Sequence, residues 1–335
     1  MRKAAGLWFF LISIGLAGLM GTGCGDKASP TTVYYLDPTP TPVGVEGKDW
    51  YFTTLTAGFG ARSDFTSLVY NNKMWVIAGN NGVLKNDVYY STDGINWTQT
   101  TASAAFSTRY FLSSLAFNDK MWVIGGYNTG YKSDVYYSSD GAVWTSATGA
   151  AAFGGRISMS TLVFNGKMWV IGGVDAGGAK DDVYDSTDGT TWTLVTAAAG
   201  LNGRAQQASV VFDNKMWVIG GTDSGNLVKA DVHYSTDGVT WTQATASAAF
   251  GARASATAMV YDGKMWVMGG SNQSGNPVGG VYYSADGVTW TAATTTEAFG
   301  PRVHSGGLVF DNKMWLIAGD DGSNFKSDVW ESPGG

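Results

Sequence analysis

The heptapeptide KMWVIAG at residues 73–79 constrains the fold more than any other feature, because close copies of it recur along the chain. The copies occupy residues 120–126, 167–173, 215–221, 264–270 and 313–319. The six tryptophans in these segments are spaced 47, 47, 48, 49 and 49 residues apart, and a second tryptophan series and an arginine series keep the same spacings. A fixed period of this length is typical of propellers and solenoids. The chain is therefore expected to contain six copies of one structural unit.

Each period reads as four short strands. In residues 64–99 these are DFTSLVY, KMWVIAG, DVYYS and INWTQ, which are rich in β-forming residues and separated by Asn- and Gly-containing breaks. The second segment is apolar on both faces, with Met and Val on one side and Trp and Ile on the other, so it needs a sheet on each side. Radial stacking gives every sheet two neighbours and leaves only short edges. The sequence predicts an all-β fold, a six-bladed propeller with four-stranded antiparallel blades.

The two ends of the repeat region complement each other. Before Arg62 the chain holds a single strand, DWYFTTL at 49–55, whereas the sixth repeat ends at DVWES, residues 328–332, without a fourth strand. We expect strand 49–55 to complete the C-terminal blade and close the ring, which makes residues 49–335 one propeller domain.

The repeat resembles the Kelch repeat, which has a basic residue opening the first strand, a hydrophobic strand ending in Gly-Gly, and downstream Asp-Val-Tyr-Tyr and Trp. The resemblance covers residues 49–332 six times. Ala78 and Ala318 depart from it at the first glycine of the doublet, and Gly280 stands where the other repeats have Asp. The STDGxxW turn also resembles a shortened Asp-box of sialidase-like propellers. Both resemblances imply a propeller, and neither implies a particular function.

The first 48 residues are predicted to serve export. Arg2 and Lys3 precede an apolar run over 4–20, so residues 1–23 read as a signal peptide. Cys24, the chain's only cysteine, is the predicted lipidation site of a bacterial lipoprotein, although Gly21 stands where such signals usually carry Leu. An uncleaved anchor, or cleavage that leaves a free thiol, are the alternatives. Residues 24–48 contain four of the seven prolines and are expected to form a semi-rigid spacer.

Composition narrows the partners. The net charge of −6 and pI near 4.9 argue against nucleic acid as a ligand. His233 and His304 are the only histidines and lie in different repeats, so the sequence supports no metal site and no cofactor. We expect a monomer, held at the bacterial cell envelope by a lipid anchor or secreted.

A residue repeated in every blade is expected to do the same structural job in each. We predict that the arginine series forms buried or half-buried ion pairs with the Asp that opens the third strand of the same repeat. The series is Arg62, Arg109, Arg156, Arg204, Arg253 and Arg302, and the aspartates are Asp87, Asp134, Asp182, Asp231 and Asp328. The fifth repeat has Gly280 at that position, so Arg253 is the arginine expected to be free for a ligand.

Function is sought where the repeats differ. The loops between second and third strands diverge, as does the residue two positions after each arginine, and both are expected on one face beside the channel mouth. The candidate ligand-binding residues are Arg253, Asp64, His304, Phe111, Tyr110, Gln206, Asn272 and Gln273. Tyr110 is expected to form an aromatic cluster with Tyr127 and Tyr131.

Two functions fit these features. The first is an exported, membrane-tethered binding or scaffold module for a glycan, peptide or protein, acting through the variable-loop face. The alternative is a periplasmic carbohydrate-active enzyme, such as a Kelch-type sugar mutarotase, in which Asp64 and His304 exchange protons at the mouth. The sequence favours binding, because it supplies no titratable pair at a spacing that certifies catalysis.

Overall fold

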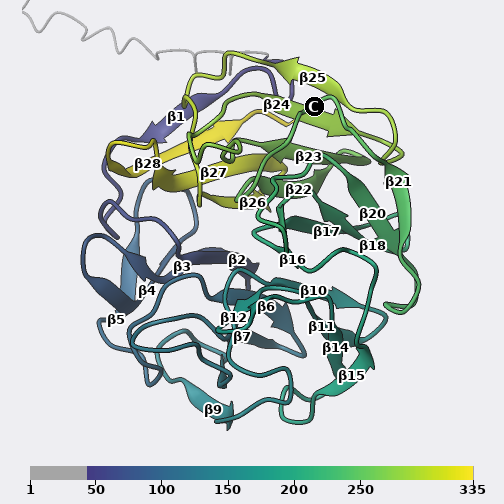
Figure 1. Ribbon diagram of the computed structural model, residues 1–335. Helices are drawn as coiled ribbons and strands as arrows, with labels where there is room; N and C mark the ends of the chain where they lie inside the picture. The colour runs from purple at the N-terminus through teal and green to yellow at the C-terminus, as the bar shows by residue number, and fades with distance from the viewer. Residues whose placement is uncertain (1–43, 335) are drawn as a thin grey trace, which may run out of the picture. The chain divides into compact units, whose positions relative to one another are not determined.

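The structure, a computed structural model, describes residues 44–334, and every regular element in this range is a β-strand. Six four-stranded antiparallel sheets surround a central axis, with the first strand of each sheet innermost (Figure 1). The all-β, six-bladed prediction is confirmed. No helix of membrane-spanning length and hydrophobicity occurs between residues 44 and 334. The predicted signal peptide, Cys24 and most of the predicted spacer lie outside the described residues.

The blades are numbered in chain order. Blade one consists of β2 (Thr66–Tyr70), β3 (Lys73–Asn80), β4 (Leu84–Ser91) and β5 (Thr98–Thr101). Blade two consists of β6 (Ser113–Phe117), β7 (Lys120–Ile124), β8 (Val135–Ser138) and β9 (Thr145–Thr148). Blade three consists of β10 (Ser160–Phe164), β11 (Lys167–Ile171), β14 (Val183–Ser186) and β15 (Thr193–Thr196). Blade four consists of β17 (Ala208–Phe212), β18 (Lys215–Ile219), β20 (Val232–Ser235) and β21 (Thr242–Thr245).

The last two blades complete the ring. Blade five consists of β22 (Thr257–Tyr261), β23 (Lys264–Met268), β24 (Val281–Ser284) and β25 (Thr291–Thr294). Blade six consists of β26 (Gly306–Phe310), β27 (Lys313–Asp320), β28 (Phe325–Ser332) and β1 (Tyr51–Thr54). Two short ribbons pair β12 (Val174–Asp175) with β13 (Gly178–Ala179), and β16 (Arg204–Ala205) with β19 (Thr222–Asp223).

The second strand of each blade forms the core between blades. In β3, Met74 and Val76 pack against blade six, whereas Trp75 and Ile77 pack against blade two. All four side chains are at most 1% exposed. The two-sided burial predicted for KMWVIAG is confirmed, because adjacent side chains of a strand point to opposite faces and each face meets a neighbouring sheet.

The Asp-Gly turns join each blade to the one before it. Gly141 of blade two has φ +75°, and a Cβ placed there would lie 2.2 Å from the Trp75 ring of blade one. A glycine is required at this position both by its left-handed backbone and by the ring against it. The same contact recurs around the ring, through Gly94, Gly189, Gly238 and Gly287.

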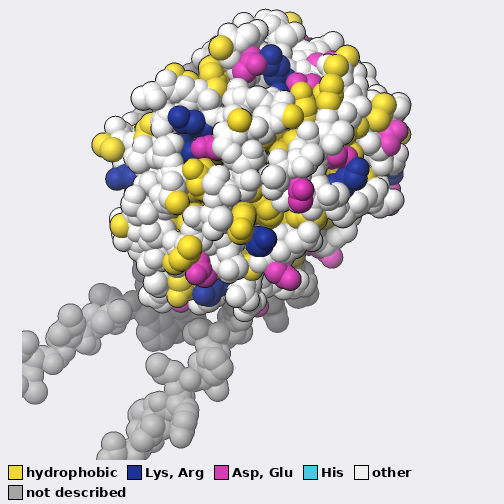
Figure 2. Space-filling model, turned by 90° about the horizontal axis from the view of Figure 1, so that it is seen from below, with side chains coloured by type: hydrophobic (Ala, Val, Ile, Leu, Met, Phe, Trp, Pro, Cys, Tyr) yellow, Lys and Arg dark blue, Asp and Glu magenta, His cyan; other side chains and the backbone are white. Residues whose placement is uncertain are grey.

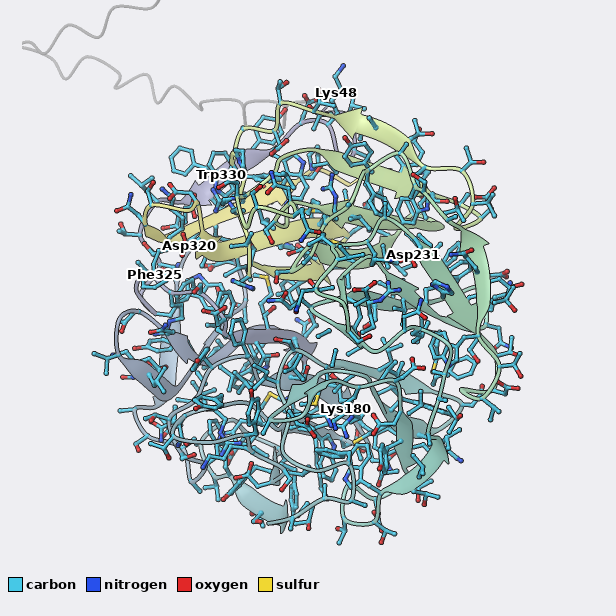
Figure 3. The ribbon with its side chains drawn as sticks, viewed as in Figure 1. Lys48, Lys180, Asp231, Asp320, Phe325 and Trp330 are labelled. Atoms are coloured by element: carbon cyan, nitrogen blue, oxygen red, sulfur yellow. The ribbon has the colours of Figure 1, made fainter. Side chains whose placement is uncertain are left out.

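The ring closes through both ends of the chain. β1 pairs antiparallel with β28, as strand counting predicted, and Figure 3 shows Trp330 of β28 beside this outer strand. The preceding turn is also shared, because Gly47 N–H donates to Ser332 Oγ at 2.8 Å and Ser332 Oγ–H donates to Asp49 carbonyl at 2.9 Å. Gly47 packs on Trp266 of blade five as the other turn glycines pack on their tryptophans. Contacts with the ring therefore begin before residue 49.

Candidate functional site at the channel mouth

Five of the six series arginines form ion pairs within their own blades, as predicted. The pairs are Arg62–Asp87, Arg109–Asp134, Arg156–Asp182, Arg204–Asp231 and Arg302–Asp328, with Nη1–Oδ1 distances of 2.5 to 2.8 Å. Each of these arginines also donates to the carbonyl sixteen residues later, at the end of the second strand. They are structural braces, since both Nη1 and Nη2 of each guanidinium donate to groups of the same blade.

Arg253 in blade five has no carboxylate within 4 Å in the described part of the chain. It is only 4% exposed, and its guanidinium donates to the carbonyls of Phe250 and Gly269. The central carbon of the guanidinium group, Cζ, lies 5.1 Å from the ring centre of Tyr282. Burial lowers the pKa of Arg253, and this effect is opposed by Tyr282 and Glu297. Arg253 therefore lacks an aspartate partner within residues 44–334, as expected. Its side chain is nevertheless buried and does not line the channel mouth.

Sequence reasoning missed Glu297, which supplies a carboxylate to blade five. Glu297 is 7% exposed, and its Oε2 accepts a hydrogen bond from Gly280 N–H at 2.7 Å. The signal was in the repeat alignment. The other repeats carry alanine at the same place, at Ala57, Ala104, Ala151, Ala199 and Ala248. Blade five therefore has Gly280 where the other blades have an aspartate, and a different carboxylate, Glu297, is hydrogen-bonded at that position.

Six residues form the mouth ring around the channel axis. They are Asp64, Phe111, Ser158, Gln206, Ser255 and His304, each two positions after a series arginine. All six have left-handed φ values, from +53° to +57°. The N–H of each ring residue from Phe111 to His304 donates to the carbonyl of the previous one, at 2.8 to 3.4 Å. The structure therefore brings Asp64, Phe111, Gln206 and His304 together as the sequence suggested.

The mouth ring closes between its first and last members. At this junction His304 Nδ1 lies 3.0 Å from Asp64 Oδ1, and Ser63 Oγ–H donates to Asp64 Oδ2 at 2.6 Å. The two atoms are in close contact without the geometry of a hydrogen bond, since Asp64 Oδ1 has no hydrogen-bond partner among the described residues. His304 Nε2 is buried and has no hydrogen-bond partner among the described residues.

An aromatic row extends from the mouth over blade two. Phe111 lies 5.1 Å from the His304 ring and 4.8 Å from Tyr110, and Tyr110 lies 5.8 Å from Tyr127. Tyr127 in turn contacts Tyr131 at 5.1 Å. Burial raises the pKa of Tyr110, and the nearby Tyr127, Asp64 and Tyr131 raise it further. The predicted tyrosine cluster is present and is continuous with the mouth ring.

Three cavities meet at this face. A mouth cavity of about 150 Å³ is lined by the mouth ring, and an axial cavity of about 260 Å³ is lined by first-strand residues, many of them Ser and Thr. A side cavity of about 310 Å³ shares Phe111, Ser158 and Gln206 with the mouth and is walled by Val174 and Ala205. No group of three His, Cys, Asp or Glu arranged to hold a metal is found in residues 44–334.

The two predicted loop residues serve the loops themselves. Gln273 Oε1 accepts from Val228 N–H at 2.7 Å, and its Nε2 donates to Asn226 carbonyl at 2.9 Å, so it joins the loops of blades four and five. Asn272 Oδ1 accepts from the N–H groups of Ser274 and Asn276 and thereby forms its own turn. Neither residue lines the mouth cavity.

Comparisons with known proteins agree with this architecture. Residues 64–270 match the KLHDC2/KLHL20/DRC7 Kelch-repeats domain, and residues 214–332 match the DUF6242 beta propeller domain. No curated protein sequence matches the chain significantly. A solved structure titled "Structure of YjhT" is similar with a TM-score of 0.67 and 16% identity, over 80% of this chain and 93% of that one, a likeness that concerns the fold alone. Because the first match spans more than half of the sequence, and six such blades close the ring, the chain belongs to the Kelch-repeat family of β-propellers.

Proposed function

We propose that this Kelch propeller is an exported, membrane-tethered binding module that captures a glycan, peptide or protein at the channel mouth. The mouth ring is the observation that supports this. Its backbone is uniform, yet its side chains are Asp, Phe, Ser, Gln, Ser and His. A left-handed residue other than glycine costs about 1–3 kcal/mol. Varied side chains kept at six strained positions around one cavity favour recognition over structure.

The Asp-Gly turns on the side of the ring offer less to a partner than the mouth does. Figure 2 shows one side of the ring, where acidic and basic side chains are scattered among backbone and other uncharged groups and hydrophobic side chains form short streaks. The exposed apolar residues Val143, Val239 and Val288 belong to separate Asp-Gly turns. A large apolar patch is the usual mark of a docking surface, so the concave mouth is a stronger candidate than these separate turns.

The binding proposal is tested by screening the full chain on glycan and peptide arrays beside two matched variants. Phe111→Ser places in blade two the residue that blades three and five carry at the same left-handed position, so the backbone should tolerate it. Val143→Ser changes an exposed side chain in the turn of the same blade. A genuine mouth ligand loses binding with Phe111→Ser and keeps it with Val143→Ser. If every array ligand binds Phe111→Ser as strongly as the parent chain, the mouth is not the binding site.

A sugar-processing enzyme is the second candidate, favoured by the Asp64–His304 contact at 3.0 Å. A carboxylate that orients an imidazole can assist proton transfer to a bound sugar. Any array hit is therefore incubated with the chain and followed by proton NMR. Turnover that disappears in His304→Gln while binding remains would replace the binding module with an enzyme.

The proposed location in the cell is inferred from the sequence of residues 1–48. A lipid on Cys24 and the Pro/Thr-rich spacer would hold the propeller at the bacterial cell envelope, with the ring acting as a monomer. Changing Cys24 to Ala should move the processed protein from the membrane fraction to the soluble one. Retention of Cys24→Ala in the membrane would show that residues 4–20 are an uncleaved anchor.

A further inference from the structure

The channel mouth has hydrogen-bond acceptors that the protein does not satisfy. Gln207 is 8% exposed, and its Nε2 donates to Ile171 carbonyl, but its Oε1 has no partner among residues 44–334. His304 Nε2 and Ser305 Oγ are also buried and unpartnered in the described chain. All three residues line the mouth cavity. Buried polar atoms nearly always have a partner, so this set calls for a molecule that brings donors.

The charge of the site restricts that molecule further. Of the described residues that line the mouth and axial cavities, none is Lys or Arg. The series arginines are committed to aspartates of their own blades or, for Arg253, to carbonyls. Asp64 is the acid of the mouth cavity. An anionic ligand would meet a carboxylate with no cation to offset it, and the cost of that contact is several-fold larger in a partly enclosed cavity than in water.

The shape of the mouth adds an apolar contact. Phe111 lies at the junction of the mouth cavity and the side cavity, next to the His304 ring. Tyr110 and Tyr127 continue the aromatic row outward from it. An aromatic face beside acceptors suits a ligand that has both C–H and O–H groups.

We propose that the mouth binds the ring of a neutral sugar, with its hydroxyl groups hydrogen-bonded to Gln207 Oε1, His304 Nε2 and Ser305 Oγ and one face of the sugar against Phe111. The inference rests on the proposed binding function and assigns it a ligand chemistry. Hydroxyl groups supply the missing donors without bringing a charge next to Asp64. They can also accept from Ser305 Oγ, which a purely donating ammonium group cannot do.

The test uses the full chain with three sets of free methyl hexosides, namely the neutral gluco, galacto and manno forms, their hexuronic acids and their 2-amino counterparts. Affinities are measured by calorimetry, and oligosaccharides ending in the preferred sugar distinguish a terminal glycan residue from a free sugar. A neutral member should bind, and its uronic acid should bind at least about 10-fold more weakly. In Asp64→Asn that difference should shrink, because the repelling charge is gone.

Two serine variants locate the sugar. Ser305→Ala removes an unpartnered hydroxyl from the mouth, so the fold should be unaffected while affinity for the neutral sugar falls by about 3- to 10-fold. Ser160→Ala is the matched control, because Ser160 Oγ is also unpartnered in the described chain but lines only the axial cavity. Its affinity should stay within about 2-fold of the parent, below the net worth of a typical hydrogen bond.

Each other result overturns the inference in a distinguishable way. Uronic acids or amino sugars that bind more tightly than the neutral form would contradict the assigned chemistry. Equal losses in both serine variants would place the sugar deep in the channel. If no sugar binds but a peptide hit is lost in Phe111→Ser, the sugar proposal fails and the binding function stands. If no ligand of any class depends on Phe111, both fail.

Discussion

Blade four gives the sharpest test of what the buried arginines contribute. Arg204 has no exposed side-chain surface, and it donates to Asp231 Oδ1 at 2.6 Å and Oδ2 at 3.0 Å. Replacing Asp231 with Gly, the residue of blade five, removes both bonds. The bonds from Arg204 to the carbonyls of Gly220 and Leu201 remain. Because a guanidinium group cannot lose its charge, the variant must keep a buried cation without its counter-charge.

The expected cost follows from this geometry. Removing one partner of a buried pair typically lowers the free energy of unfolding by about 3–5 kcal/mol. The lower end, about 3 kcal/mol, is expected here, because Arg253 shows that a series arginine can be held largely by carbonyls. Adding Ala248→Glu places a carboxylate where Glu297 stands in blade five. One charged hydrogen bond regained is worth about 1.5 kcal/mol, so the double variant should be the more stable of the two.

Urea unfolding followed by tryptophan fluorescence measures these differences. Asp231→Ala is compared with Asp231→Gly to separate the lost ion pair from the added backbone freedom of glycine, which is worth about 0.5–1 kcal/mol. Ala248→Glu alone should destabilise, since it buries a second acid beside an intact pair. The reasoning is refuted if Asp231→Ala costs less than about 1 kcal/mol. It is also refuted if Ala248→Glu further destabilises the Asp231→Gly variant.

Three further predictions follow from the turns. Gly141→Ala should lower the free energy of unfolding by about 2–4 kcal/mol in the same urea assay, because the new Cβ meets the Trp75 ring at 2.2 Å and the backbone is left-handed; an unchanged midpoint would contradict it. Ser332→Ala should cost about 1–2 kcal/mol and speed hydrogen exchange in β1, whereas Ser91→Ala, in a turn made by one stretch of chain, should leave β1 exchange unchanged. Burial raises the pKa of Asp93, but hydrogen bonds from Asn96, Ile95 and Ser91 outweigh it and lower the pKa from 3.8 to about 2. This stabilisation is present above about pH 4 and is lost as the pH falls through about 2, so the melting temperature should drop over that range, and less steeply in Asp93→Asn.

The architecture could be predicted from the sequence because the residues that determine it recur in every repeat. The two-sided strand KMWVIAG, the leftover strand 49–55 and the Arg–Asp spacing all repeat, so one copy interprets the others. The position two after each arginine was correctly placed at the channel mouth for the same reason. Whether Asp64, His304, Phe111, Tyr110 and Gln206 bind a ligand stays a prediction.

The features that sequence reasoning missed are departures from the period. Gly47 takes part in a closing turn whose serine, Ser332, comes from the other end of the chain, so the Ser-x-Asp-Gly pattern is absent from residues 44–50. Glu297 could not be predicted from the third-strand position of Gly280, because it lies seventeen residues later, in the linker after β25, and only the fold brings the two together. Gln273 looked available because its partners, Asn226 and Val228, lie in the irregular loop of another blade.

The shared closing blade sets an order on folding. Among the described strands, β1 is synthesised first and its partner β28 last, so Tyr51 and Glu331 pair across most of residues 44–334. Such distant pairing slows folding. Until β28 has been made, Tyr51 and Phe52 of β1 and the adjacent Leu55, which are exposed even in the finished ring, lie on an unpaired segment. A strand of this kind can join the wrong sheet, so a nascent propeller is most vulnerable to misassembly at β1 and is protected only once β28 pairs with it.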